Sequence, residues 1–261
     1  MMTHPRARFE LVIARYDESI EWSEPYRGVR TIYSKGPPLK RFRDDVRQQA
    51  LRREAQPPPD DAYVETANVG REAHSYLTYI IDHYDALPEY IGFSQVLRAC
   101  RFATTNTNAT QTLLQGELDS AHDWIRSDYG PSMFTNMLEE AEGRGEGCSF
   151  PLKTDPQNPG DFGFAFDGGG AMMDKYTRTN SRHTAKNFGS FFYDVLGLRP
   201  EQGGHLLRFY PSGFMVVSRE RVLQRSVTYY EALRRQVDYA NDPVEGHYLE
   251  RSWFYIFNCH A

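Results

Sequence analysis

The clearest pattern of hydrophobic and polar positions lies between residues 64 and 95. Apolar side chains recur there every three or four residues, as on one face of a helix, and polar side chains occupy the other face. The apolar face is formed by Ala73, Tyr76, Leu77, Ile80, Ile81 and Tyr84. The pattern predicts a helix over 70–84 that packs against an apolar surface and ends before Pro88.

Short apolar runs predict strands at 9–14, 29–33 and 90–95. The first run is continuously apolar, which is typical of a strand covered on both faces of a mainly parallel sheet. A helix that starts with polar and glycine residues between two strands indicates a βαβ unit. The sequence therefore predicts an α/β fold: a single domain over 1–261, with a mainly parallel central sheet flanked by helices.

The rest of the chain is less regular. Residues 39–55 are charged and helix-prone, and we interpret them as a solvated helix or a mobile excursion. Residues 143–170 are rich in glycine and proline and are expected to form mainly loop. Further strands are expected at 112–115, 205–209 and 213–217, and helices at 118–128, 132–142, 188–196, 219–239 and 243–257.

Composition narrows the class of protein. The net charge of −5, with acidic residues interleaved among the basic ones, argues against nucleic acid as the main partner. The three cysteines are odd in number and share no metal-ligand spacing, so we expect a reducing compartment and a cytoplasmic protein. No signal peptide or transmembrane segment is recognisable. The sequence does not indicate an oligomeric state.

Two polar clusters lie where an α/β fold usually holds its ligand. Arg15 and Asp17 follow the first strand, and ligands of such sheets bind at the carboxyl ends of strands. Residues 68–72 open the helix: Asn68 is expected to cap it, Gly70 to allow close approach, and Arg71 to meet phosphate or sugar. Ordinary capping with exposed charges is the alternative for this second cluster.

Two further clusters contain acids that suit metal or proton chemistry. Glu117 and Asp119 follow the expected strand at 112–115, and such a pair can hold Mg²⁺ or Mn²⁺ against a diphosphate; a charge pattern at a helix start explains it equally well. In the last helix, His247 and Glu250 share a face, which suits a metal site or an acid/base pair. The alternative there is a Glu–Arg ion pair beside a buffering histidine.

Four segments in the same order along nearly the whole chain resemble an uncharacterised family of domains of unknown function associated with GT-A glycosyltransferases. They are residues 12–16 (VIARY) followed by Trp22, residues 68–77 (NVGREAHSYL), residues 208–219 (RFYPSGFMVVSR) and residues 245–253 (EGHYLERSW).

The resemblance implies a GT-A-like, Rossmann-like domain with a nucleotide-sugar half over about 9–120 and an acceptor half over about 121–261. It implies transfer of a sugar from a nucleotide-sugar to a glycan or small-molecule acceptor, assisted by a divalent metal. The roles that follow are nucleotide binding by Arg15, Asp17, Asn68, Gly70, Arg71 and Glu72, metal binding by Glu117, Asp119 and His247, and catalysis by Glu250, Glu245 and His247.

Two other classes of function stay open. One is a metal-dependent hydrolase or oxygenase built on His183, His205, His247 and the acids. The other is a carbohydrate-binding module without catalysis. Binding of a nucleotide or glycan without turnover would indicate the second class.

Overall fold

The computed structural model describes the central sheet of the protein and helices that cover it. The residues described are 8–18, 20–37, 61–95, 133–143, 145, 147–150, 154–155, 158–159, 163–165, 188–198, 206–208 and 213–259. The expected strand at 112–115, the helix at 118–128, the acids Glu117 and Asp119, and His183 and His205 lie outside them.

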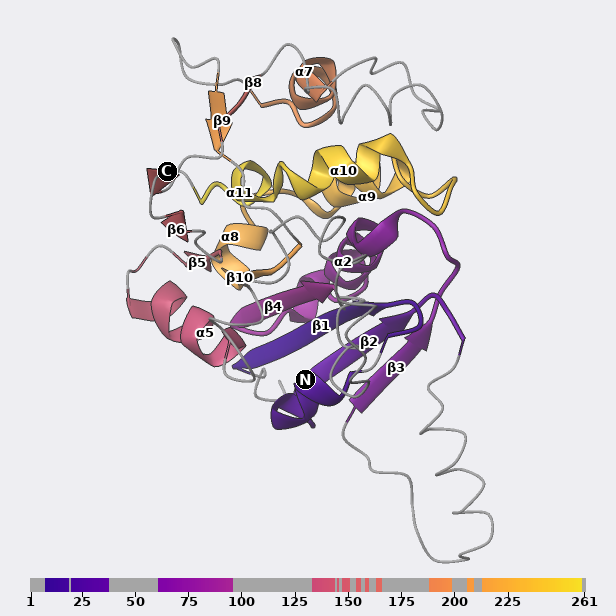
Figure 1. The fold of residues 1–261 in the computed structure, drawn as a ribbon, viewed down its shortest axis with the longest axis vertical. Helices are drawn as coiled ribbons and strands as arrows, with labels where there is room; N and C mark the ends of the chain where they lie inside the picture. Colours follow the sequence, from indigo (N-terminus) through magenta and orange to yellow (C-terminus); the bar gives the residue numbers. More distant parts are fainter. Residues whose placement is uncertain are drawn as a thin grey trace, which may run out of the picture.

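A mixed six-stranded sheet forms the centre, with its strands in the order β3-β2-β1-β4-β10-β5 (Figure 1). Its strands are β1 (Phe9–Arg15), β2 (Arg30–Ser34), β3 (Asp61–Glu65), β4 (Tyr90–Gln95), β5 (Cys148–Ser149) and β10 (Met215–Ser218). The first four strands are mutually parallel, while β10 runs antiparallel to both β4 and β5. Two separate two-stranded antiparallel sheets pair β6 (Thr154–Asp155) with β7 (Asn158–Pro159), and β8 (Gly163–Ala165) with β9 (Leu206–Arg208).

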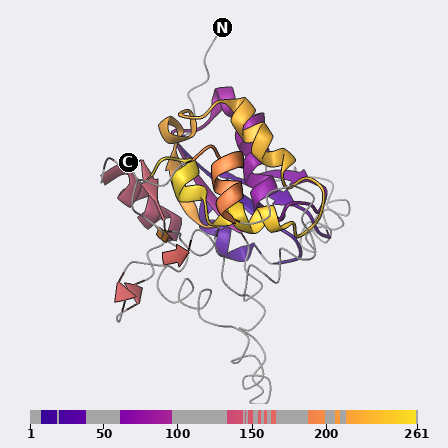
Figure 2. The ribbon, with the colours of Figure 1, turned by 90° about the horizontal axis from the view of Figure 1, so that it is seen from above.

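The helices lie on both faces of this sheet. They are η1 (Glu21–Tyr26), α2 (Arg71–Asp82), η2 (Tyr84–Ala86), α5 (Met133–Gly143), α7 (Phe188–Ser190), η5 (Phe191–Val195), α8 (Arg219–Val222), α9 (Val227–Arg235), α10 (Val244–Glu250) and α11 (Trp253–Ile256). In Figure 1, α2, α9 and α10 stack above the sheet and α5 lies near the β5–β10 edge. Figure 2, seen from above, shows the gold and orange C-terminal helices in front of the strands. No described helix has the length and apolar character needed to cross a membrane.

Strand alternation divides the core in two. Successive residues of β1 point to opposite faces, so Val12 packs with the α2 layer, while Leu11 and Ile13 pack with η1 and α5. All three are fully buried. Burial on both faces explains why the sequence of β1 is continuously apolar instead of alternating.

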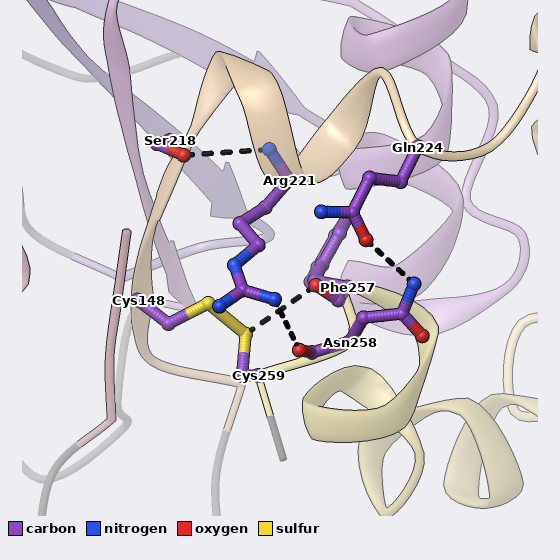
Figure 3. The surroundings of a disulfide bond; sticks show 7 residues. All are labelled: Cys148, Ser218, Arg221, Gln224, Phe257, Asn258 and Cys259. Carbon is purple, nitrogen blue, oxygen red and sulfur yellow. Dashed lines mark hydrogen bonds between the residues drawn. A yellow bond between two sulfur atoms is a disulfide. The ribbon is translucent and has the colours of Figure 1, made fainter. Parts of the chain in front are cut away.

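A disulfide between Cys148 and Cys259 closes the β5 edge (Figure 3). It joins β5 to the segment after α11, across 111 positions of sequence. Hydrogen bonds hold the same segment to α8, because Arg221 Nη1 donates to the Asn258 carbonyl at 2.5 Å. The expected reducing compartment does not fit this bond, since disulfides form and persist mainly under oxidising conditions. An odd count of cysteines gave no sign that two of them pair.

Most predicted elements in the described part are confirmed, with shifted ends. The strands at 9–14, 29–33 and 90–95 and the helix at 70–84 correspond to β1, β2, β4 and α2. The helices expected at 219–239 and 243–257 are each broken into two, around residues 223–226 and 251–252. The expected parallel sheet is confirmed in part: β1 to β4 are parallel, and β10 and β5 extend the sheet in antiparallel pairing, so that it is mixed.

Candidate functional site

A pocket of about 660 Å³ opens at the carboxyl ends of β1 and β4. From β1 the chain continues outward to β2 and β3, and then crosses to β4 on the other side of β1. The strand order therefore reverses between β1 and β4, and open α/β sheets usually hold ligands at such a crevice. Arg15 ends β1 and Gln95 ends β4, and both line the pocket.

Arg15 forms one wall and is only 5% exposed. Its guanidinium donates to the Glu18 carbonyl, the Ser34 hydroxyl and the Pro37 carbonyl at 2.8–2.9 Å. All three partners are neutral, and no described carboxylate forms an ion pair with it. Burial of an uncompensated charge is costly, so binding of an anion beside this guanidinium would be favourable.

Lys35 brings a second cation to the pocket from the residue after β2. Its ammonium donates to the carbonyls of Val69 and Arg71 and so holds the turn before α2 against β2. Burial lowers the pKa of Lys35 to about 8, against an opposing effect of Glu72. Within the described part of the chain it forms no ion pair, and the attraction of Glu72 offsets the effect of burial only in part.

The start of α2 is shaped by Gly70, which has a left-handed backbone (φ 64°). A Cβ there would lie 2.6 Å from the Val237 carbonyl oxygen, so the glycine allows α2 to dock on the segment before α10. Gly70 and Arg71 donate their backbone N–H groups to the carbonyls of Ala240 and Asn241. These two amides are therefore satisfied by protein and do not await an anion. Asn68 lies too far before Arg71 to cap the helix, and it lines the pocket instead.

Arg71 is the centre of a charged cluster at the pocket wall. Its Nε lies 3.5 Å from Glu72 and 3.7 Å from Asp242, and its Nη1 lies 3.8 Å from Glu250. The same Nη1 contacts both ring nitrogens of His247. This cluster links α2 to α10, two elements far apart in the sequence.

His247 is neutral near pH 7 in this cluster. Burial, and then the positive charge of Arg71, lower its pKa to about 4. Its Nε2 lies 3.1 Å from Asp242 Oδ1, which suits a tautomer that donates to Asp242 and accepts from Arg71. A guanidinium in contact with the ring is an unfavourable neighbour for a metal cation, so the expected role of His247 as metal ligand is not supported by its surroundings.

The remaining predicted residues lie at different distances from the pocket. Asp17 follows the pocket residue Tyr16 but is not part of the lining. Glu250 also lies outside the lining and faces Arg71. Glu245 is fully buried and accepts a hydrogen bond from the Tyr239 hydroxyl at 2.6 Å, which indicates a structural carboxylate. The described residues contain no group of three or more His, Cys, Asp or Glu that could hold a metal ion.

Lys35 and Asp242 are among the pocket residues that were not expected from the sequence. Lys35 directly follows a buried parallel strand, so the rule that identified Arg15 would have found it as well. Asp242 carries no such signal, because it reaches the pocket only through the docking of residues 237–241 on Gly70.

Comparison with known proteins gives one finding. A family described as "Protein of unknown function (DUF3431)" matches residues 37–122. The match includes β3, α2 and β4, and with them Asn68, Arg71, Glu72 and Gln95 of the pocket. Neither the curated proteins nor the solved structures gave a match. The comparison supports an uncharacterised family over this part of the chain and assigns it no activity.

Proposed function

We propose that the protein is a glycosyltransferase whose pocket binds a nucleoside-diphosphate sugar. The observation that carries the proposal is a pair of cations that face one pocket, the buried Arg15 and the half-buried Lys35, neither of which forms an ion pair with a described carboxylate. A diphosphate has the charge to compensate both. The position of the pocket at the reversal of strand order is also where open α/β sheets usually bind nucleotides.

The pocket also offers groups that suit the neutral parts of such a ligand. Asn68 and Gln95 present amides that can donate to and accept from sugar or ribose hydroxyls. The volume of about 660 Å³ lies within the range of pockets that enclose ligands of this size. In the transfer, the leaving group is a diphosphate, so cations near it stabilise the charge that develops as the glycosidic bond breaks.

The proposed reaction assigns no role to a divalent metal. The described residues do not fit one, because His247 lies against Arg71 and no three or more described His, Cys, Asp or Glu residues are grouped so that they could hold a metal ion. Glu117 and Asp119 lie outside the described residues. We therefore assign the compensation of the diphosphate charge to Arg15 and Lys35 and derive no step through a metal.

The test is a binding panel with a matched pair of variants. UDP-, GDP- and TDP-sugars and the free diphosphates are titrated by calorimetry and by thermal shift, with and without Mn²⁺, because a ligand of the native state raises its apparent stability. We expect at least one nucleotide to bind, and Arg15→Met to weaken that binding by about 10–100-fold, as loss of a charge-assisted contact does.

Arg27→Met is the control, since Arg27 is an exposed arginine paired with Glu24 near the opposite ends of the strands. It is expected to bind like the wild type. Failure of every nucleotide and nucleotide-sugar to bind the wild type would overturn the proposal. Binding without transfer to any acceptor would instead indicate a non-catalytic binding module.

A further inference from the structure

Glu72 has an unusual position among the acids of the protein. It stands on the first turn of α2, lines the pocket, and has a side chain that is only 5% exposed. Its Oε2 lies 3.5 Å from Arg71 Nε, whereas its buried Oε1 accepts no hydrogen bond from any described residue. A buried carboxylate oxygen without a donor is unfavourable, so this group gains most from a ligand that donates to it.

The other acids around the pocket are already engaged. Glu18 Oε2 accepts the backbone N–H groups of Tyr16 and Asp17, at 2.9 and 3.1 Å. Asp242 lies 3.1 Å from His247 Nε2 and is half-exposed. Of the described acids that line the pocket, Glu72 alone has a buried oxygen without a hydrogen-bond partner.

We propose that Glu72 is the general base of the transfer reaction, an inference that rests on the proposed function. In a single displacement, the acceptor hydroxyl oxygen forms a bond to the anomeric carbon of the donor. The bond from that carbon to the diphosphate oxygen breaks, and its electron pair leaves with the nucleoside diphosphate. The hydroxyl proton passes to the Glu72 carboxylate, and the anomeric configuration is inverted.

The charges around Glu72 suit this role. Burial raises its pKa; Arg71 opposes this effect, and Glu250 adds to it. From the other elements, His247 on α10 and Lys35 after β2 also face it. A carboxylate whose pKa lies nearer to the working pH is a stronger base than an ordinary one. Lys35 is close enough to Glu72 to interact with it electrostatically. The diphosphate of the nucleotide-sugar, at Lys35, and the proton acceptor, Glu72, can therefore occupy the same pocket.

The test compares Glu72→Gln with Glu250→Gln, because Glu250 is one of the residues for which the family resemblance implied a catalytic role. The reaction is followed with the nucleotide-sugar that binds the wild type best and a panel of sugar-alcohol and glycan acceptors. Glu72→Gln is expected to lower kcat by about 10²–10⁴-fold, the usual contribution of a general base. Its affinity for the donor should stay within about threefold, since the carboxylate does not bind the diphosphate.

A pH profile separates a base from a residue that only supports the fold. The wild-type kcat/KM should fall at low pH as Glu72 is protonated, and this decline should disappear in Glu72→Gln but persist in Glu250→Gln. Formate should restore part of the turnover to Glu72→Ala. A kcat of Glu72→Gln within threefold of wild type, or an unchanged decline at low pH, would overturn the inference.

Two further outcomes are distinct from these. If Glu72→Gln does not fold, as judged by its melting temperature, Glu72→Asp replaces it: the carboxylate is kept but withdrawn by one methylene, and an intermediate kcat is expected. Wild-type kinetics in Glu72→Asp would then contradict the proposal. If no nucleotide-sugar binds the wild type, both the proposed function and the role of Glu72 are contradicted. If Glu72→Gln binds the donor and turns it over at the normal rate, only the role of Glu72 as general base is contradicted.

Discussion

Two buried arginines stand at opposite ends of neighbouring parallel strands. Arg30 begins β2 and Arg15 ends β1, and they are 4% and 5% exposed. Arg30 donates to Asp61 at 2.6 and 2.8 Å and to Glu24 at 3.1 Å. Arg15 donates only to carbonyls and a hydroxyl. The two arginines are therefore equally buried but differ in charge compensation. Arg30, at the amino ends of the parallel strands, is compensated by carboxylates, whereas Arg15, at their carboxyl ends, has a charge that a ligand can compensate.

The comparison teaches that burial alone does not identify a functional cation. A guanidinium with carboxylate partners has its charge matched inside the protein, so its removal leaves those carboxylates unpaired. A guanidinium bonded only to neutral oxygens leaves a net positive potential in the pocket. Substitutions of the two arginines should therefore differ: loss of Arg30 should lower stability, and loss of Arg15 should lower binding.

The largest loss of stability is expected far from both arginines, at the disulfide. Replacing both Cys148 and Cys259 with serine removes a cross-link between positions 111 residues apart. The chain entropy of the unfolded state that such a cross-link removes corresponds to about 4–5 kcal/mol of stability. Unfolding in urea, compared with that of the disulfide-bonded wild type, measures the loss of stability, and the reduced wild type is the control that should unfold like the variant. The nucleotide affinity of the folded variant should stay near wild type, because neither Arg15 nor Lys35 contacts this edge. A parallel loss of affinity would show that the pocket depends on the β5 edge.

A smaller loss of stability is expected from Arg30→Met. It leaves Asp61 and Glu24 without their shared cation, and loss of one member of a buried ion pair costs about 3–5 kcal/mol. We expect about 3 kcal/mol, since the Glu24 side chain is 38% exposed and partly solvated. Urea unfolding of Arg30→Met and Arg15→Met side by side tests the contrast: Arg15→Met should lose less than half as much. Equal losses would remove the distinction between the two arginines.

The sequence predicted those parts of the fold and site that depend on local pattern. The apolar runs of β1 and β4 and the stripe of α2 arise from nearby residues, and Arg15 was identified because it follows a buried strand. β3 was not predicted, because an edge strand of only five residues, half-exposed, has little pattern of its own. The contacts of Arg71 with Asp242 and His247, and the pairing of Cys148 with Cys259, depend on long-range docking that no local pattern records.

The smallest effect concerns pH and involves Lys35. Burial lowers its pKa from 10.5 to about 8, so above that pH the folded protein loses the ammonium charge while the unfolded chain keeps it. Nucleotide-diphosphate affinity should therefore fall several-fold as the pH rises from 7 to 9, a loss of one charge-assisted contact.

Stability should change in the opposite direction as the pH rises above about 8. Between about pH 8 and 10.5 the unfolded chain binds more protons at this site than the folded protein, so the contribution of Lys35 to the free energy of unfolding rises with pH. Lys35→Met removes both dependences, and it is measured beside the wild type by calorimetry and urea unfolding at pH 7, 8 and 9. If the affinity of Lys35→Met falls with pH as steeply as that of the wild type, the titrating cation is another group, and Lys35 only holds the turn before α2.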